Sequence, residues 1–316
     1  MVSKMRWPAE AAVSFARDGF ILTPAPLLSD AVIAALKERY VRLFAGDFET
    51  GSYPDEWHWR EGISRAEATR EICNGWKADR LVASVVTSAA IGELVCHLTG
   101  WSDARVGQDD CLWKPPGGTS VGYHTDGVYI SEQFRPVEDN SITVWIALDD
   151  ADAETGVVEY ARGSHNWPPV SLAATSASFH GGANDQFRAD AHAASPDGTL
   201  DVVALDVPRG YAVLHHQDVW HGSAPNVSAI RARRALGIHL VRGDVSFRPG
   251  EPFGDAAAAA GAPDYIYGRY KQRGSLALSE DAFPITCGPR RSAFLDGYTA
   301  TASVVELHAP AVADSR

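Results

Sequence analysis

The chain reads Tyr123-His124-Thr125-Asp126-Gly127 at the end of a β-prone run, and this stretch decides the fold class. In an extended strand, side chains two residues apart face the same side, so His124 and Asp126 can reach one ion while Thr125 faces away. Gly122 and Gly127 flank the pair and permit close backbone approach and sharp turns. The stretch therefore predicts a β-rich fold with a metal site at a strand end.

A third ligand is available in Val219-Trp220-His221-Gly222-Ser223. Two imidazoles and one carboxylate form the facial triad that holds non-haem Fe(II) and leaves the opposite coordination positions open for substrate and dioxygen. The set His124, Asp126 and His221 therefore predicts an iron-dependent oxygenase.

Two further histidines precede His221 and leave an alternative open. His215 and His216 lie on the same approach, and His216 with Asp218 makes a second His-x-Asp spacing. The other interpretation of both histidines is an ordinary core or turn residue.

The hydrophobic period of the chain changes to two near residue 101. Short β-prone runs separated by Gly, Pro, Asn and Asp follow. They cover residues 108–114, 121–130, 141–148, 157–160, 202–205, 211–215 and 233–241. Runs of this kind predict a mainly β fold, in which a jelly roll, or double-stranded β-helix, forms a core at about 101–245.

The segments on either side of this core differ from it. Residues 8–17, 29–44 and 79–98 show helical spacing of apolar residues, with Ser29 as a cap, so a helical region at about 8–100 should pack on the core. Residues 51–75 read as irregular, residues 171–200 as a lid, binding loop or disordered excursion, and residues 255–261 as a linker. With residues 246–316 as a C-terminal extension, the expected arrangement is a single domain over 1–316.

Composition narrows the class of partner. Lys and Arg number 28 against 40 Asp and Glu, a formal charge of −12, which argues against nucleic acid and anionic membranes and favours a small-molecule substrate. The four cysteines include no Cys-x-x-Cys pair, so neither a disulfide framework nor a thiolate zinc site is indicated. Without a signal peptide or long apolar span, a cytoplasmic monomer or homodimer is expected.

An arginine cluster follows the third ligand. A guanidinium on a barrel strand can present a bidentate fork to a carboxylate, and the far carboxylate of a metal-bound 2-oxoglutarate is a natural counterion. Arg233 alternates with the small residues Ala235 and Gly237, which suits a filled pocket. A surface cluster is the competing interpretation, above all for Arg231 and Arg234.

The order of these motifs resembles the phytanoyl-CoA dioxygenase family of Fe(II)/2-oxoglutarate oxygenases over about residues 10–245. Each motif alone is weak evidence for this family, whereas the order and spacing of the motifs together are specific to it. The motifs are Phe15-Ala16-Arg17-Asp18-Gly19-Phe20, Lys114-Pro115-Pro116-Gly117, His124-x-Asp126, Val144-Trp145-Ile146-Ala147-Leu148-Asp149-Asp150, residues 156–165, His221-Gly222-Ser223-x-x-Asn226 and an Arg-Arg-Ala-Leu stretch.

The resemblance implies that His124, Asp126 and His221 ligate Fe(II), with O2 at an open position, and that Arg233 and Ser223 bind the distal carboxylate of 2-oxoglutarate. It also brings two other residues near the cosubstrate or substrate, namely Trp145 and Gln108. A core tryptophan and an ordinary polar strand residue are the competing interpretations of these two.

One departure from the family pattern concerns the arginine. It often lies eleven residues after the distal histidine, where this chain has Ala232, so one extra residue would put Arg233 in register and leave Arg231 as the alternative. Relatives that halogenate have Ala or Gly in place of Asp126. The aspartate therefore favours oxygen insertion or hydrogen abstraction.

The expected activity is hydroxylation of a small metabolite or natural-product intermediate of secondary metabolism, with release of succinate and CO2. Desaturation, epimerisation or cyclisation would use the same residues. No basic cluster resembles a coenzyme A phosphate site. Two other classes stay open: a cupin-like metalloenzyme without 2-oxoglutarate, which a pairing of Arg233 with a protein carboxylate would favour, and a non-catalytic jelly-roll binding protein.

Overall fold

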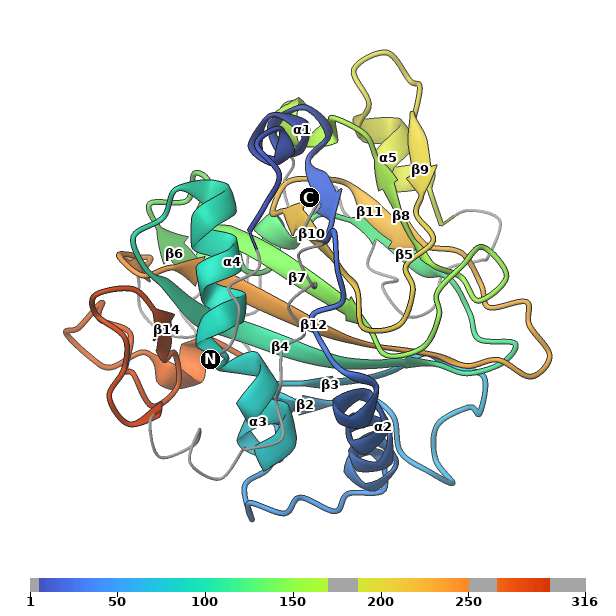
Figure 1. Ribbon diagram of the computed structural model, residues 1–316, viewed down its shortest axis with the longest axis horizontal. Helices are drawn as coiled ribbons and strands as arrows, with labels where there is room; N and C mark the ends of the chain where they lie inside the picture. Colours follow the sequence, from blue (N-terminus) through green and yellow to red (C-terminus); the bar gives the residue numbers. More distant parts are fainter. Residues whose placement is uncertain (1–5, 170–186, 250–265, 296–316) are drawn as a thin grey trace, which may run out of the picture.

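Two antiparallel sheets face each other in the computed structural model, which describes residues 6–169, 187–249 and 266–295 (Figure 1). The larger, eight-stranded sheet has the order β1-β10-β7-β12-β4-β3-β2, with β14 also paired to β4. Its strands are β1 (Phe20–Leu22), β10 (Ala212–His216), β7 (Ser141–Ala147), β12 (Arg233–Arg242), β4 (Ala104–Lys114), β3 (Arg70–Cys73), β2 (Glu56–Trp57) and β14 (Ile285–Cys287).

The smaller sheet has the order β5-β11-β8-β9, and a separate pair joins β13 to β6. These strands are β5 (Val121–His124), β11 (His221–Ser223), β8 (Val158–Ala161), β9 (Val202–Ala204), β13 (Ser246–Phe247) and β6 (Phe134–Arg135). The predicted mainly β fold with a jelly-roll core is confirmed.

Side-chain alternation gives the larger sheet two different faces. In β7, Ile142 and Val144 belong to an outer apolar core, whereas Thr143 and Trp145 point to the inner side and line a cavity. The neighbouring strand β12 repeats this pattern in register, with His239 opposite Thr143. The inner face of the larger sheet therefore carries polar side chains, whereas its outer face carries the apolar side chains of the core.

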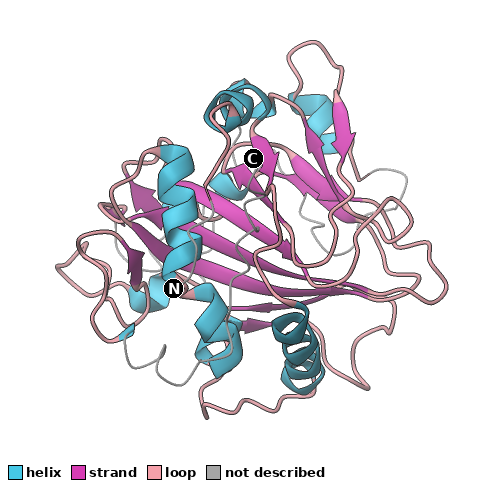
Figure 2. Ribbon diagram, viewed as in Figure 1, coloured by secondary structure: helices cyan, strands magenta, loops and turns pink. Residues whose placement is uncertain are grey.

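Helices cover the outer face (Figure 2). These helices are α1 (Ala11–Asp18), α2 (Asp30–Phe44), α3 (Arg80–Val86) and α4 (Ala89–Thr99), whereas α5 (Ala189–Ala194) packs against β5 of the smaller sheet. The predicted cap of α2 is present, because Ser29 Oγ accepts a hydrogen bond from Val32 N at 3.4 Å. One continuous core joins Leu36 of α2, Val82 of α3 and Ile238 of β12.

The structure corrects two local expectations. The single helix predicted over 79–98 is two helices, because α3 ends at Val86 and α4 begins at Ala89. The region 51–75, read as irregular, contains the short strands β2 and β3. They are too short to show a period, but β3 pairs with β4 and β2 pairs with β3 at the edge of the sheet. The predicted linker at 255–261 and residues 170–186 of the predicted insertion lie outside the described residues.

Within the described part of the chain, one helical stretch is apolar enough to span a membrane by length and composition. It is Arg80–Thr99, with a mean hydropathy of 1.7, and 61% of it is buried inside the protein. It comprises α3 and α4, whose inward residues Val82 and Leu94 belong to the outer core. Burial of this extent is typical of core helices.

Candidate active site

Two histidines face each other across neighbouring strands of the smaller sheet. His124 ends β5 and His221 begins β11, and the strand register pairs them directly. Their ring centroids lie 4.3 Å apart. Gly222 permits this close strand approach, since a Cβ there would lie 2.5 Å from the Tyr123 ring.

The same kind of hydrogen bond orients both imidazoles. His124 Nδ1–H donates to Gly122 O at 2.8 Å, and His221 Nδ1–H donates to Val219 O at 3.0 Å. This tautomer puts the lone pair of each ring on Nε2, the atom that lies nearest to Asp126 Oδ1. Burial, followed by the neighbouring His221, lowers the pKa of His124 to about 3, so this imidazole is neutral, as metal binding requires.

Asp126 follows the end of β5 and begins a short 3-10 turn, η2 (Asp126–Val128). Thr125 keeps an extended backbone, with φ −119° and ψ 141°, so the predicted alternation holds. Asp126 Oδ1 lies 3.7 Å from His124 Nε2 and 3.5 Å from His221 Nε2. Burial alone would raise the pKa of Asp126, but His221 and His239 hold it well below its usual range, so the group is a carboxylate.

The second oxygen of Asp126 has other partners. Oδ2 accepts hydrogen bonds from Thr143 Oγ1 and, at 3.0 Å, from His215 Nε2. His239 Nδ1 lies 3.5 Å from the same oxygen. Burial opposes the charge on His239, but Asp126 and Asp110 raise its pKa to about 10, which makes both ring nitrogens donors.

The alternative His-x-Asp pair does not converge on this point. His216 Nε2 lies 2.9 Å from Asp139 Oδ1, and the Asp218 side chain is 48% exposed. His215, by contrast, is buried and hydrogen-bonded to Asp126, a role that sequence reasoning missed. Side chains alternate between the two faces of β10, and His215 lies on the inward face. This alternation could have identified the role of His215.

A second metal-like group occurs among the described residues, formed by His58, Glu71 and Cys73. Burial raises the pKa of the Cys73 thiol well above its ordinary value. A protonated thiol is a poor metal ligand, so this group is the weaker candidate.

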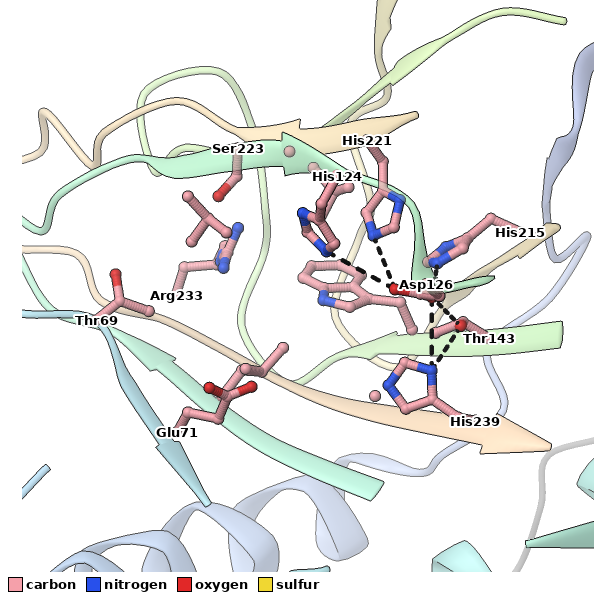
Figure 3. Close-up of a pocket in the computed structure, with 16 residues that line it drawn as sticks. Thr69, Glu71, His124, Asp126, Thr143, His215, His221, Ser223, Arg233 and His239 are labelled. Atoms are coloured by element: carbon pink, nitrogen blue, oxygen red, sulfur yellow. Dashed lines mark hydrogen bonds and ion pairs between the residues drawn. The ribbon is translucent and has the colours of Figure 1, made fainter. Parts of the chain in front are cut away.

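One cavity joins the three metal-ligand candidates to a cationic region (Figure 3). Its empty space is about 620 Å³, open mouth included, a size typical of small-molecule sites. Arg233 and Ser223 lie on one side of the cavity, and His124, His221 and Asp126 lie on the other. The lining residues are Thr69, Glu71, Leu112, Val121, His124, Asp126, Thr143, Trp145, Val158, His215, His221, Gly222, Ser223, Arg233, Gly237 and His239.

Arg233 is 2% exposed and has few partners of its own. Its Nη1 donates to Gly156 O, and its guanidinium carbon lies 5.3 Å from the centre of the Trp145 ring. Its Nε has no hydrogen-bond partner within the described part of the chain. Burial lowers the pKa of Arg233 to about 10, because the charged form is costly to desolvate.

Arg231 has a different environment. It donates to Asp152 Oδ2 at 2.7 Å and to Glu154 Oε2 at 2.6 Å, and its side chain is 38% exposed. Of the two arginines proposed for a carboxylate, Arg233 is therefore the one that the fold brings into the cavity.

Lys114 is a second buried cation, next to Arg233. It begins the Lys114-Pro115-Pro116-Gly117 motif, but the sequence did not indicate a role for it. It lies opposite Arg233 in the strand register, and its Nζ donates to Ser223 Oγ at 2.6 Å and Ala224 O at 2.5 Å. Burial, followed by repulsion from Arg233, lowers the pKa of Lys114 well below its ordinary value. Side chains two residues apart in β4 face the same side, and Leu112 lies on the cavity wall. Strand alternation could therefore have identified Lys114.

Of the two residues that the resemblance brought near the cosubstrate, Trp145 lines the cavity. Gln108 is not on the described cavity wall. Its Nε2 donates to Asp110 Oδ1 at 2.9 Å, and Asp110 in turn contacts His239. Gln108 thus lies behind the cavity and not beside Arg233.

The donor set fits a first-row metal ion. Two imidazole nitrogens and one carboxylate oxygen lie within 4.8 Å of one another, all from buried residues. This combination on one side of an ion, with the cavity on the other, matches the facial triad of non-haem iron.

The chain also matches a known protein family. Residues 15–235 match the family described as phytanoyl-CoA dioxygenase (PhyH). A probable alpha-ketoglutarate-dependent hypophosphite dioxygenase from Stutzerimonas stutzeri is 28% identical over 155 residues, which are 49% of this chain and 51% of the relative. The matched stretch thus spans about half the length of that curated relative.

Several solved structures share the fold. The non-heme alpha-ketoglutarate-dependent epimerase SnoN from nogalamycin biosynthesis has a TM-score of 0.65 at 18% identity, covering 88% of this chain and 97% of its own. The carbocyclase SnoK from the same biosynthesis has a TM-score of 0.60 at 21% identity, covering 88% and 96%. EctD from S. alaskensis has a TM-score of 0.62 at 18% identity, covering 90% and 88%.

Proposed function

The chain belongs to the phytanoyl-CoA dioxygenase family, and on that premise we propose that it is a non-haem Fe(II) oxygenase that uses 2-oxoglutarate to oxidise a small molecule. One observation carries the proposal. One cavity has two imidazoles and a carboxylate at one end and Arg233 with Ser223 at the other, where Lys114 donates to Ser223 and lies opposite Arg233 in the strand register. A metal ion satisfies the first end, and a dicarboxylate reaching from it would satisfy the second.

His124, Asp126 and His221 would hold the iron. Bound there with 2-oxoglutarate and dioxygen, Fe(II) supplies the oxidising chemistry that attacks a substrate C–H bond, with succinate and carbon dioxide as co-products. The role of the protein is to fix the ligands and to exclude bulk water from the cavity.

The far end of the cavity would recognise the cosubstrate. Arg233 would offer its guanidinium to the distal carboxylate, and Lys114 and Ser223 would add a second charge and a hydroxyl. The Trp145 ring, next to the Arg233 guanidinium, would form an apolar wall along the carbon chain. Gln108 would support the site from behind through Asp110.

This arrangement weighs against the two alternative classes. A cupin-like enzyme without 2-oxoglutarate would be favoured by a protein carboxylate on Arg233, but the Arg233 hydrogen bond in the described residues goes to the Gly156 carbonyl. A non-catalytic binding protein would not need three convergent metal ligands with a cavity beside them.

For the substrate, we favour a small organic molecule, a metabolite or natural-product intermediate, because the empty space of about 620 Å³ has the size of a small-molecule site. SnoN and SnoK belong to nogalamycin biosynthesis, whereas the Stutzerimonas stutzeri relative is named for hypophosphite, and we take the former two as the better guide. Hydroxylation is the default outcome, with desaturation, epimerisation and cyclisation as variants on the same residues.

The proposal extends to the domain organisation, the location and the oligomeric state of the protein. We infer one catalytic domain over residues 1–316, with the jelly-roll core near 101–245, working in the cytoplasm as a monomer or homodimer of secondary metabolism. The acidic net charge of −12 supports a small-molecule partner over nucleic acid or an anionic membrane.

The test is spectroscopic. Under anaerobic conditions, the wild-type protein with Fe(II) and 2-oxoglutarate should develop a metal-to-ligand charge-transfer band at visible wavelengths, and neither component alone should produce it. On admission of air with ascorbate, succinate should form and rise further with a matching substrate. Metal-dependent activity without the band would favour the cupin-like class, and absence of both would remove the enzymatic proposal.

A further inference from the structure

The two oxygens of Asp126 have different neighbours. Oδ1 faces the two imidazole nitrogens, at 3.7 Å from His124 and 3.5 Å from His221. Oδ2 accepts hydrogen bonds from Thr143 and His215 and points away from that pair. The carboxylate is therefore held with one oxygen turned toward the metal position and the other engaged by protein donors (Figure 3).

A line of side chains on three adjacent strands stands behind Oδ2. Thr143 lies on β7, His239 opposite it on β12, and Asp110 on β4. His239 Nδ1 is 2.8 Å from Thr143 Oγ1, and His239 Nε2 is 2.6 Å from Asp110 Oδ2. A threonine hydroxyl has one proton, which Thr143 donates to Asp126, so the hydroxyl accepts from His239.

The line continues away from the cavity. Asp110 Oδ1 accepts from Gln108 Nε2 at 2.9 Å, and Gln108 Oε1 accepts from Tyr267 Oη at 3.1 Å. Tyr267 belongs to the C-terminal described segment 266–295, 159 residues from Gln108 along the chain. All members are buried, so water does not compete for these hydrogen bonds.

We propose that Thr143, His239 and Asp110 are positioning residues that restrict Asp126 to one-oxygen coordination of the metal. This inference rests on the proposed function. Three protein ligands leave three positions on an octahedral ion, two for 2-oxoglutarate and one for dioxygen. If Oδ2 were released, the carboxylate could bind through both oxygens and occupy a position that 2-oxoglutarate or dioxygen needs.

The sharpest test compares Thr143→Val with Thr143→Ser. Valine keeps the shape of threonine without the hydroxyl, and serine keeps the hydroxyl. In Thr143→Val we expect the dissociation constant for 2-oxoglutarate, read anaerobically from the charge-transfer band, to rise about tenfold. The d–d spectrum of the Co(II)-loaded protein should also change, reporting altered coordination. Thr143→Ser should restore both readouts toward wild type.

A second comparison uses the histidine. His239→Gln removes the link between Thr143 and Asp110, and Asp110→Asn weakens it without changing shape. Both should shift the Co(II) spectrum in the direction of Thr143→Val. The matched control is His216→Gln, which removes another histidine with an aspartate partner, Asp139 at 2.9 Å, and should leave the spectrum unchanged.

The outcomes separate this inference from the proposed function. A wild-type protein without the charge-transfer band contradicts the proposed function itself. A wild-type band with unchanged spectra and dissociation constants in Thr143→Val and Asp110→Asn overturns the positioning role. Lower unfolding temperatures in these variants with unchanged metal spectra would also overturn it, since that is the result of a purely structural role.

Discussion

The two ends of the cavity are built in opposite ways. At the metal end, the protein supplies hydrogen-bond partners for each ligand: carbonyls fix His124 and His221, and Thr143 and His215 hold one oxygen of Asp126. At the cationic end, Lys114 and Arg233 lie side by side without a carboxylate partner in the described residues. The protein itself organises the first end, whereas the second is the end at which we propose that an external carboxylate binds.

Electrostatics explain why this difference matters. Two buried cations on facing strands repel each other and lose hydration, which disfavours the charged forms. A dicarboxylate that also reaches the metal would relieve both costs. Residues that would prepare the metal are thus distinct from residues that would select its co-ligand, so substitutions at the two ends should affect metal binding and cosubstrate binding separately.

Removal of the carboxylate should break the metal end. We expect Asp126→Ala to lower succinate release more than about a hundredfold, since loss of even an outer partner of a metal ligand costs 10- to 100-fold. Fe(II) binding, measured by equilibrium dialysis, should weaken in parallel. Asp218→Ala, at the other His-x-Asp spacing, is the control and should behave as wild type. Retained turnover in both Asp126→Ala and His124→Ala would exclude this triad.

Removal of one arginine should break the cationic end alone. In Arg233→Gln, the dissociation constant for 2-oxoglutarate should rise roughly 30-fold or more, the equivalent of about 2 kcal/mol for a buried charge pair. Fe(II) binding should change little. Arg231→Gln removes the surface arginine bound to Asp152 and should leave cosubstrate binding intact. The opposite ranking of the two variants would assign the carboxylate to Arg231.

Loss of the lysine beside Arg233 should have a milder effect on cosubstrate binding. Lys114→Met should weaken 2-oxoglutarate binding about tenfold, yet leave the free energy of unfolding without cosubstrate unchanged or raise it by about 1 kcal/mol, because a desolvated cation is removed. Urea denaturation with and without 2-oxoglutarate measures both quantities. A large loss of stability without cosubstrate would mean that the Lys114 hydrogen bonds to Ser223 and Ala224 dominate instead.

Substitution of Asp109 should have the smallest effect on metal and cosubstrate binding. Asp109 neighbours Asp110 in sequence, but its carboxylate accepts a hydrogen bond from Trp76 N on the outer side of the sheet. Burial raises the pKa of Asp109 to about 8. The folded state therefore keeps a proton that the unfolded state loses near pH 4, so this group makes stability fall as pH rises from about 4 to about 8, by at most about 1.4 kcal/mol per pH unit.

Asp109→Asn should flatten that decline, because asparagine does not ionise. Urea denaturation at several pH values checks it, and Fe(II) and 2-oxoglutarate binding should stay at wild-type values. An unchanged pH profile in the variant would mean that Asp109 is not the source of the dependence.

Local patterns account for what could be predicted. The period of two gave the core strands and the jelly roll, and Ser29 gave the start of α2. The three metal-ligand candidates were found because two of them lie in one short motif. The break between α3 and α4 and the edge strands β2 and β3 were missed, since apolar spacing does not report helix ends and two to four residues are too few for a period.

The sequence by itself determined the ligand types, the strand alternation and the family. Only the tertiary structure decided which oxygen of Asp126 is engaged, which arginine enters the cavity and that Lys114 lies opposite it. The physical reason is separation along the chain. Thr143 lies 17 residues from Asp126, and Asp110 lies 129 residues from His239, so strand register and not local pattern brings these partners into hydrogen-bond distance.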